Sequence, residues 1–122
     1  METPEQPLPK PLRWVASAKK DLIAMPGPVK RKIGFAFYLA QIGEKHPATK
    51  PLRGFGSAAV LEVIEEYQGD TYRAVYTVRL KRAVYVLHCF KKKSTKGAQT
   101  PRPDMELIRS RLKAAEEMDE GV

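Results

Sequence analysis

The sequence predicts a single α+β domain, with a small antiparallel sheet of about four strands, a helical hairpin on one face and a C-terminal helix. Apolar residues alternate with a period of two in three segments of the second half, as in strands. They recur with helical spacing in residues 28–44 and again after residue 101. The length of 122 residues supports one modest core.

The N-terminal half predicts a strand followed by two helices. Residues 1–11 are rich in proline and predict a flexible arm, which leaves one domain over residues 12–118. The LRWVA run at 12–16 alternates like a strand, and Ser17 is placed to cap a short helix that Pro26-Gly27-Pro28 ends. The second helix, 28–44, has an apolar stripe of Val29, Ile33, Phe37 and Ala40, which Phe35, Tyr38, Leu39 and Ile42 are expected to widen.

The C-terminal half predicts an antiparallel meander and a last helix. Residues 47–59 are expected to form a loop, followed by strands at 60–67, 72–79 and 83–90 with tight connections. Residues 91–99 are expected to form a basic, flexible loop, after which Thr100 is expected to cap a helix that Pro101 begins. The apolar seam of that helix consists of Met105, Ile108, Leu112 and Ala115.

Positive charge is concentrated in one part of the chain. The formal net charge is +8, and residues 71–103 hold nine Lys or Arg with no Asp or Glu. Four acidic residues lie in 60–70, and six lie in 104–122. This asymmetry predicts a polyanionic partner such as a nucleic acid.

Several classes of protein are disfavoured by the residues present. Cys89 is the one cysteine, so there is no intrachain disulfide framework, and we expect a buried thiol in a reducing compartment. Two histidines and one cysteine without clustered spacing predict no metal site and no cofactor. No apolar run approaches the roughly 20 residues of a membrane span, and no signal core begins the chain, so we expect a cytoplasmic protein.

Alternation along the strand at 72–79 predicts that its arginines and its core side chains lie on opposite faces of the sheet. We assign Tyr72, Ala74, Tyr76 and Val78 to a face covered by helices, and the opposite set of Arg73, Val75, Thr77 and Arg79 to an open, functional face. Arg73 has an alternative, an ion pair across the sheet with Glu62 or Glu65. The lysine run 91–93 has the alternative of a solvated loop. His88 aligns with Val84, Val86 and Phe90, which favours a core histidine with one hydrogen bond over a catalytic one.

A cluster of Arg, Lys and Tyr suits the cleavage of RNA without a metal ion. The 2′-hydroxyl of RNA is a built-in nucleophile, so the protein must stabilise charge on the phosphate and transfer protons. Arg stabilises charge but is not a base, whereas a Lys crowded by other cations has a pKa shifted toward a useful range.

Three runs of sequence resemble the RelE/ParE superfamily of bacterial toxins, in particular the HigB-like, phage-associated branch. These runs are YRAVY (72–76), HCFKKK (88–93) and TPRPDMELIRSRL (100–112). The resemblance implies a RelE-like microbial ribonuclease fold, cleavage of mRNA on the ribosome, and neutralisation by an antitoxin, often a helix-turn-helix protein. The arginine of the Glu-aliphatic-Arg run that is usual in this branch is absent here, where the run is Glu62-Val63-Ile64.

By position, the resemblance implies that Arg73 binds the scissile phosphate and that Lys91, Lys92 and Lys93 belong to the catalytic set. We expect the remaining RNA contacts from Lys50, Arg53, Arg79, His88 and Lys96. Two other functions remain open: a non-enzymatic, ParE-like inhibitor of DNA gyrase, and a non-toxic basic protein that binds nucleic acid.

Overall fold

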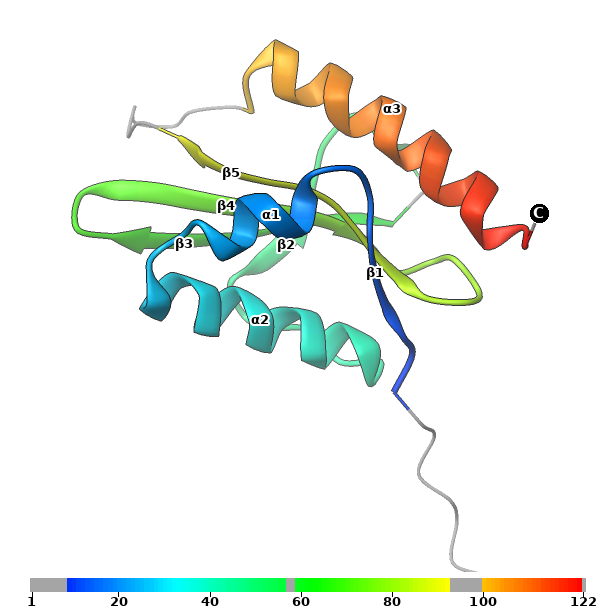
Figure 1. Ribbon diagram of the computed structural model, residues 1–122, viewed down its shortest axis with the longest axis horizontal. Coiled ribbons are helices and arrows are strands. Elements are labelled where there is room, and N and C mark those ends of the chain that lie inside the picture. The colour runs from blue at the N-terminus through cyan, green and yellow to red at the C-terminus, as the bar shows by residue number, and fades with distance from the viewer. Residues whose placement is uncertain (1–8, 57–58, 93–99, 122) are drawn as a thin grey trace, which may run out of the picture.

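The protein is a mixed five-stranded sheet between two helical layers. The computed structural model describes residues 9–56, 59–92 and 100–121. Helices α1 and α2 cover one face of the sheet and α3 covers the other (Figure 1). This confirms the predicted α+β class, with one strand more than expected. The elements are β1 Leu12–Trp14, α1 Ala18–Ile23, α2 Gly27–Gln41, β2 Thr49–Pro51, β3 Val60–Tyr67, β4 Asp70–Thr77, β5 Val84–Lys92 and α3 Arg102–Asp119.

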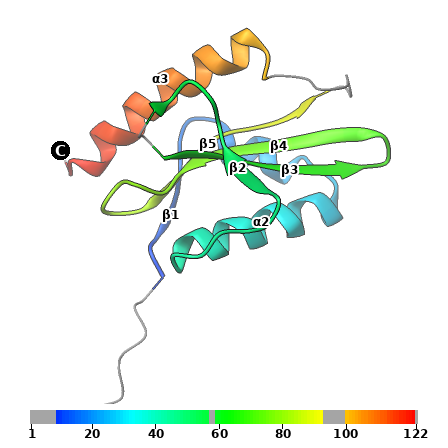
Figure 2. The same cartoon turned by 180° about the vertical axis from the view of Figure 1, so that it is seen from behind.

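The sheet has the order β1-β5-β4-β3-β2. The predicted meander of β3, β4 and β5 is confirmed and is antiparallel throughout. The first strand pairs in parallel with β5, so the sheet is mixed. The additional strand β2 lies in the predicted loop and pairs with β3, visible from behind in Figure 2. Its sequence, TKP, has no apolar alternation, so only the pairing with β3 defines it.

The helix α2 buries the predicted stripe but not its predicted extension. Pro28 lies in the first turn, where its fixed φ favours the helix and its missing N–H has no partner to lose. Val29, Ile33 and Phe37 are almost fully buried. Phe35 and Tyr38 keep 52% and 50% of their surface exposed, so the expectation that they widen the stripe is wrong. They lie beyond the arc of the helix that the sheet covers.

Neither of the two hydroxyls that were expected to cap a helix makes a capping hydrogen bond. Ser17 occupies the N-cap position of α1, but its hydroxyl donates to Asp21 Oδ2 at 2.8 Å. The N-cap of α3 is Pro101, and Thr100 Oγ1 instead donates to Glu62 Oε2 at 3.3 Å. Both hydroxyls therefore hold a carboxylate in place.

The seam of α3 packs as predicted on the second face of the sheet. Ile108 and Ala115 are fully buried there, against Val75 and Leu87. The far end of α3 is fixed by Asp119, whose Oδ1 accepts from the Arg82 N–H at 2.7 Å. This helix therefore covers a face that the alternation pattern left open.

The folded domain begins before residue 12. The Lys10 N–H donates to the Gln41 carbonyl at 2.9 Å, and the Val84 N–H donates to the Pro11 carbonyl at 2.9 Å. Lys10 and Pro11, expected in the arm, are thus bound to α2 and β5. No helix in the described ranges has the length and hydropathy needed to cross a membrane.

Candidate functional site

A β-bulge in β5 determines which side chains reach the face under α3. Val75 of β4 is opposite His88, whereas the next residue, Tyr76, is opposite Val86, so Leu87 is an extra residue in β5. The extra residue reverses the alternation beyond it. His88 therefore leaves the face of Val84 and Val86 and stacks on Phe90, with ring centroids 4.6 Å apart. The predicted alignment of His88 with Val84 and Val86 is wrong for this reason.

Arg73 lies beneath α3 in a buried ion pair. Its Nη1 is 3.0 Å from Glu62 Oε2, and the Arg73 and Glu62 side chains are 10% and 2% exposed. The predicted open face is therefore covered, and the alternative of a cross-sheet ion pair with Glu62 is the one observed. A charge pair with this little exposure needs good geometry and further hydrogen bonds to offset its desolvation. Here the Thr100 hydroxyl donates one such bond to the same Glu62 oxygen.

Lys92 joins this pair at the end of the sheet. It follows His88 and Phe90 at intervals of two in β5, so it shares their face. The pKa of Lys92 is lowered, first by partial desolvation and then by the positive charge of Arg73, while the carboxylates of Glu62 and Asp104 oppose the shift. The crowding of a lysine by a cation, expected from the sequence, thus applies to Lys92.

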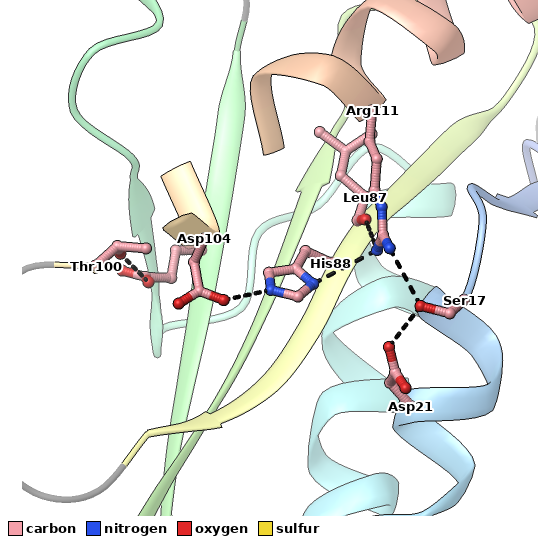
Figure 3. Close-up of polar contacts among 8 residues, drawn as sticks. Ser17, Asp21, Leu87, His88, Thr100, Asp104 and Arg111 are labelled. Atoms are coloured by element: carbon pink, nitrogen blue, oxygen red, sulfur yellow. Dashed lines mark hydrogen bonds and ion pairs between the residues drawn. The ribbon is translucent and has the colours of Figure 1, made fainter. Parts of the chain in front are cut away.

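A polar network beside this cluster joins β5 to α3 and to the residue before α1 (Figure 3). His88 Nε2 lies 2.7 Å from Asp104 Oδ1, at the start of α3. Arg111 Nη1 donates to the Leu87 carbonyl at 2.9 Å, and its Nη2 donates to Ser17 Oγ at 3.1 Å. His88 is a buried histidine held by a carboxylate, in agreement with the core role that the sequence favoured.

The structure brings only some of the other predicted residues to this cluster. Lys50 is opposite Glu62 in the β2–β3 pair, so its exposed side chain shares the face of Arg73. Lys91 points to the opposite face and lies 3.5 Å from Asp70 Oδ2. Arg79 is exposed beyond the far end of β4, where the sequence expected a strand, and is not part of the cluster.

The remaining predicted cations are not placed at the cluster by the described part of the structure. Arg53 is exposed after β2. Lys93 and Lys96 lie outside the described residues, so their roles stay predictions. In the described part of the chain, no group of three or more His, Cys, Asp or Glu side chains is placed to hold a metal ion.

Cys89 has the environment of a core residue. Its side chain is buried in the core beneath α1 and α2. Burial raises the pKa of its thiol to about 12, with a smaller contribution from the Asp21 carboxylate. Such a thiol is protonated at neutral pH and is a poor nucleophile.

The sequence was compared with models of known protein families. Residues 20–113 match the family described as phage derived protein Gp49-like (DUF891). The chain belongs to this Gp49-like family. The match spans α1 to most of α3 and includes every residue of the cluster described above. It confirms the phage-associated branch that the three motifs indicated.

One solved structure similar to this Gp49-like protein is the toxin–antitoxin complex RelBE2 from Mycobacterium tuberculosis. The identity is 24% over 70% of this chain and 100% of that chain, with a TM-score of 0.46. No curated protein matches the sequence.

Two acidic residues of the cluster in the Gp49-like protein were not among the predicted site residues. The sequence indicated Glu62 only as an alternative ion-pair partner of Arg73, and Asp104 contacts His88 from the start of α3. The signal for Glu62 is its place in strand alternation, opposite Val75 and on the same face as Arg73. No sequence signal connects Asp104 to His88, because the bulge that aims His88 at α3 has no residue signature.

Proposed function

We propose that this Gp49-like protein is the toxin of a type II toxin–antitoxin system, acting as a metal-independent endoribonuclease on mRNA at the ribosome. The observation that carries the proposal is the position of Lys92 beside the buried Arg73–Glu62 pair, with a lowered pKa. RNA brings its own nucleophile, so a proton-transfer group next to a fixed cation is sufficient for cleavage. The resemblance of three motifs to toxins of this class supports the same function.

In this mechanism the neutral amine of Lys92 takes the proton of the 2′-hydroxyl. The 2′-oxygen then forms a bond to the adjacent phosphorus while the bond from phosphorus to the 5′-oxygen breaks, which leaves a 2′,3′-cyclic phosphate. The 5′-oxygen takes a proton from water, and Lys92 later returns its proton to the solvent, so the products are a cyclic phosphate and a 5′-hydroxyl. A lowered pKa increases the fraction of Lys92 that is neutral at pH 7.

Arg73 has two roles in the proposal. Its charge keeps the pKa of Lys92 low, and its guanidinium stabilises the negative charge that grows on the phosphate oxygens. Glu62 is a positioning residue, since its carboxylate holds Arg73 Nη1 at 3.0 Å. Lys50 and Lys91 add positive charge around the site and attract the RNA backbone.

The test compares growth and RNA cleavage after inducible expression of two variants, each of which lacks one exposed or partly exposed lysine. Lys92→Ala removes the proton-transfer group, and Lys113→Ala on α3 is the matched control. We expect Lys92→Ala to restore growth and to eliminate the new RNA ends seen by primer extension, while Lys113→Ala remains toxic. Circular dichroism checks that both variants fold.

Continued RNA cleavage by folded Lys92→Ala contradicts the assignment of the base. Absence of RNA cleavage by the wild-type chain, with growth arrest intact, contradicts the nuclease function itself.

We also propose an antitoxin, expected to be a helix-turn-helix protein, as the partner. The exposed apolar side chains of α2, Phe35, Tyr38 and Ile42, recur at intervals of three and four and form one stripe. Such a stripe supports a protein partner. Co-purification with the product of the adjacent reading frame tests this.

A second function, the non-enzymatic inhibition of DNA gyrase, is favoured by one observation. The charge of Arg73 is already balanced by Glu62 in the interior, which reduces its value for binding a phosphate. This alternative predicts DNA damage and intact mRNA on expression. Measuring both in the same culture separates the two functions.

A further inference from the structure

A hollow beside β5 is left by an incomplete neighbouring strand. β1 pairs with β5 only from Val84 to Val86, and the chain turns away at Ala16, which has a φ of 51°. In the described part of the chain no strand pairs with the outer edge of β5 beyond this point. The turn at the end of α1 lies there instead, and the hollow between them is lined by Asp21, Ala24, Met25, Pro26, Tyr72 and residues 88–91.

The lining combines apolar surface with a few polar groups. Ala24, Met25 and Pro26 offer aliphatic surface, and Tyr72 adds an aromatic ring from β4. Lys91 contributes a cation to the lining, and Asp21 contributes a carboxylate. A flat ring with polar edges and a phosphate attached fits this combination, because the ring packs on apolar surface while its edge finds a hydrogen bond.

The Asp21 carboxylate is held in a fixed orientation. Its Oδ2 accepts from Ser17 Oγ at 2.8 Å, and Ser17 in turn accepts from Arg111 Nη2 at 3.1 Å (Figure 3). Among the described residues, the structure records no hydrogen bond to Oδ1. This leaves a preorganised acceptor at the hollow, and preorganisation lowers the cost of binding a donor.

We propose that this hollow binds a nucleobase that carries an exocyclic amino group, with Asp21 as the acceptor. The inference deepens the proposed ribonuclease function and rests on it. Lys91 lines the hollow, whereas the next residue, Lys92, faces the proposed catalytic cluster on the opposite side of the strand. An RNA chain that crosses the end of β5 can thus place one phosphate at Lys92 and a neighbouring base in the hollow.

The chemistry of the acceptor selects among bases. Adenine, cytosine and guanine each present an amino group that can donate to a carboxylate. Uracil has a single edge N–H, flanked by two carbonyl oxygens that the carboxylate repels. Asp21 is therefore a specificity-determining residue that disfavours uridine at one position of the RNA.

The test uses the purified full chain and the 3′-monophosphates of adenosine, cytidine, guanosine and uridine. We expect the three amino-bearing nucleotides to bind roughly ten-fold more tightly than the uridine nucleotide, the ratio expected when one hydrogen bond to a charged group is lost. The backbone amide signals of Ala24, Met25 and Cys89 should shift on binding. Asp21→Ala should remove the preference, because it removes the acceptor. Glu44→Ala, which removes an exposed carboxylate that follows α2, should keep the preference.

Equal affinity for all four nucleotides overturns the proposal, as does a preference that survives in Asp21→Ala. Shifts confined to residues away from the hollow overturn it as well. RNA cleavage is measured separately. Cleavage without base preference supports the nuclease function and contradicts the base site. Selective nucleotide binding without RNA cleavage supports the base site and contradicts the nuclease function.

Discussion

Two ion pairs of this protein have the same nitrogen-to-oxygen distance of 3.0 Å but differ in their exposure to water. Arg73–Glu62 lies beneath α3, with side-chain exposures of 10% and 2%. Lys32–Glu65 lies on the surface, with exposures of 65% and 18%. Water screens the second pair, whereas breaking the first leaves an uncompensated charge in the interior.

The first prediction follows from this contrast. Glu62→Gln should lower the free energy of unfolding by about 3–5 kcal/mol, because it removes the buried carboxylate that opposes the charge of Arg73. Lys32→Ala should change it by about 0–1 kcal/mol. Urea unfolding followed by circular dichroism measures both. The double variant Glu62→Leu with Arg73→Met should be more stable than Glu62→Gln, and the opposite order would show that the pair is not the origin of the loss.

The pKa of Lys92 gives a second prediction at the residue scale. Arg73 lowers this pKa and Asp104 raises it, so removal of each charge should have an opposite effect. Arg73→Gln should raise the pKa toward its ordinary value, and Asp104→Asn should lower it further. If neutral Lys92 is the base, the rising limb of the rate against pH moves to higher pH in Arg73→Gln and to lower pH in Asp104→Asn.

NMR titration of the lysine side chains follows the pKa directly, with Lys92→Ala used to assign the signal. Movement of both variants in the same direction contradicts the assigned electrostatics. An unchanged rate profile, with the NMR shifts present, excludes Lys92 as the base.

At the scale of elements, α3 is fixed to the sheet by its side chains as well as by its apolar seam. Arg111 reaches the Leu87 carbonyl at the bulge and the Ser17 hydroxyl before α1. Arg109, one half-turn away, donates to the Gly54 carbonyl at an exposed position and lies over the Phe55 ring. One helix thus offers a partly buried and an exposed arginine contact for comparison.

The third prediction concerns these two arginines. Arg111→Met should destabilise the fold by about 1–3 kcal/mol, because the partly buried Leu87 carbonyl and Ser17 hydroxyl lose their donor. Arg109→Met should cost less, since water replaces the donor at Gly54. Urea unfolding measures the difference, and equal losses would show that burial at the bulge has no energetic role.

At the scale of the whole molecule, the net charge of +8 is consistent with binding a polyanion. Lys50 and Lys92 lie on the face of the sheet that carries Arg73, whereas Lys91 lies on the opposite face. Part of the acidic stretch 60–70 is already occupied, with Glu62 on Arg73 and Glu65 on Lys32. Asp70 likewise lies 3.5 Å from Lys91, so the acidic stretch offsets part of the positive charge of this surface.

The fourth prediction follows from this charge distribution. The affinity for single-stranded RNA should fall as salt increases, with a slope of log K against log salt of roughly −0.7 for each phosphate contacted. Replacing Lys91 and Lys92 by Ala should make the slope less steep by about one such increment each, and Lys113→Ala should leave it unchanged. Fluorescence anisotropy over a salt series measures the slope. An unaltered slope in the Lys91 and Lys92 variants would place the RNA elsewhere.

The sequence by itself determined the α+β class, the order of the main elements and the run of three lysines, 91–93, but not which of them lies beside Arg73. Alternation and helical spacing are local properties, so they identify β3, β4 and the buried stripe of α2 without a fold. The same local patterns predicted Cys89 as a core residue, which its burial confirms.

Only the tertiary structure decided which face of the sheet is covered and which side chains meet there. β2 exists through its pairing with β3, and the bulge at Leu87 reverses the alternation that the sequence indicated for His88. The Arg73–Glu62 pair and the His88–Asp104 contact join residues 11 and 16 positions apart. Such contacts depend on register and on the path of α3 over the sheet, which are properties of the packed chain and not of any one segment.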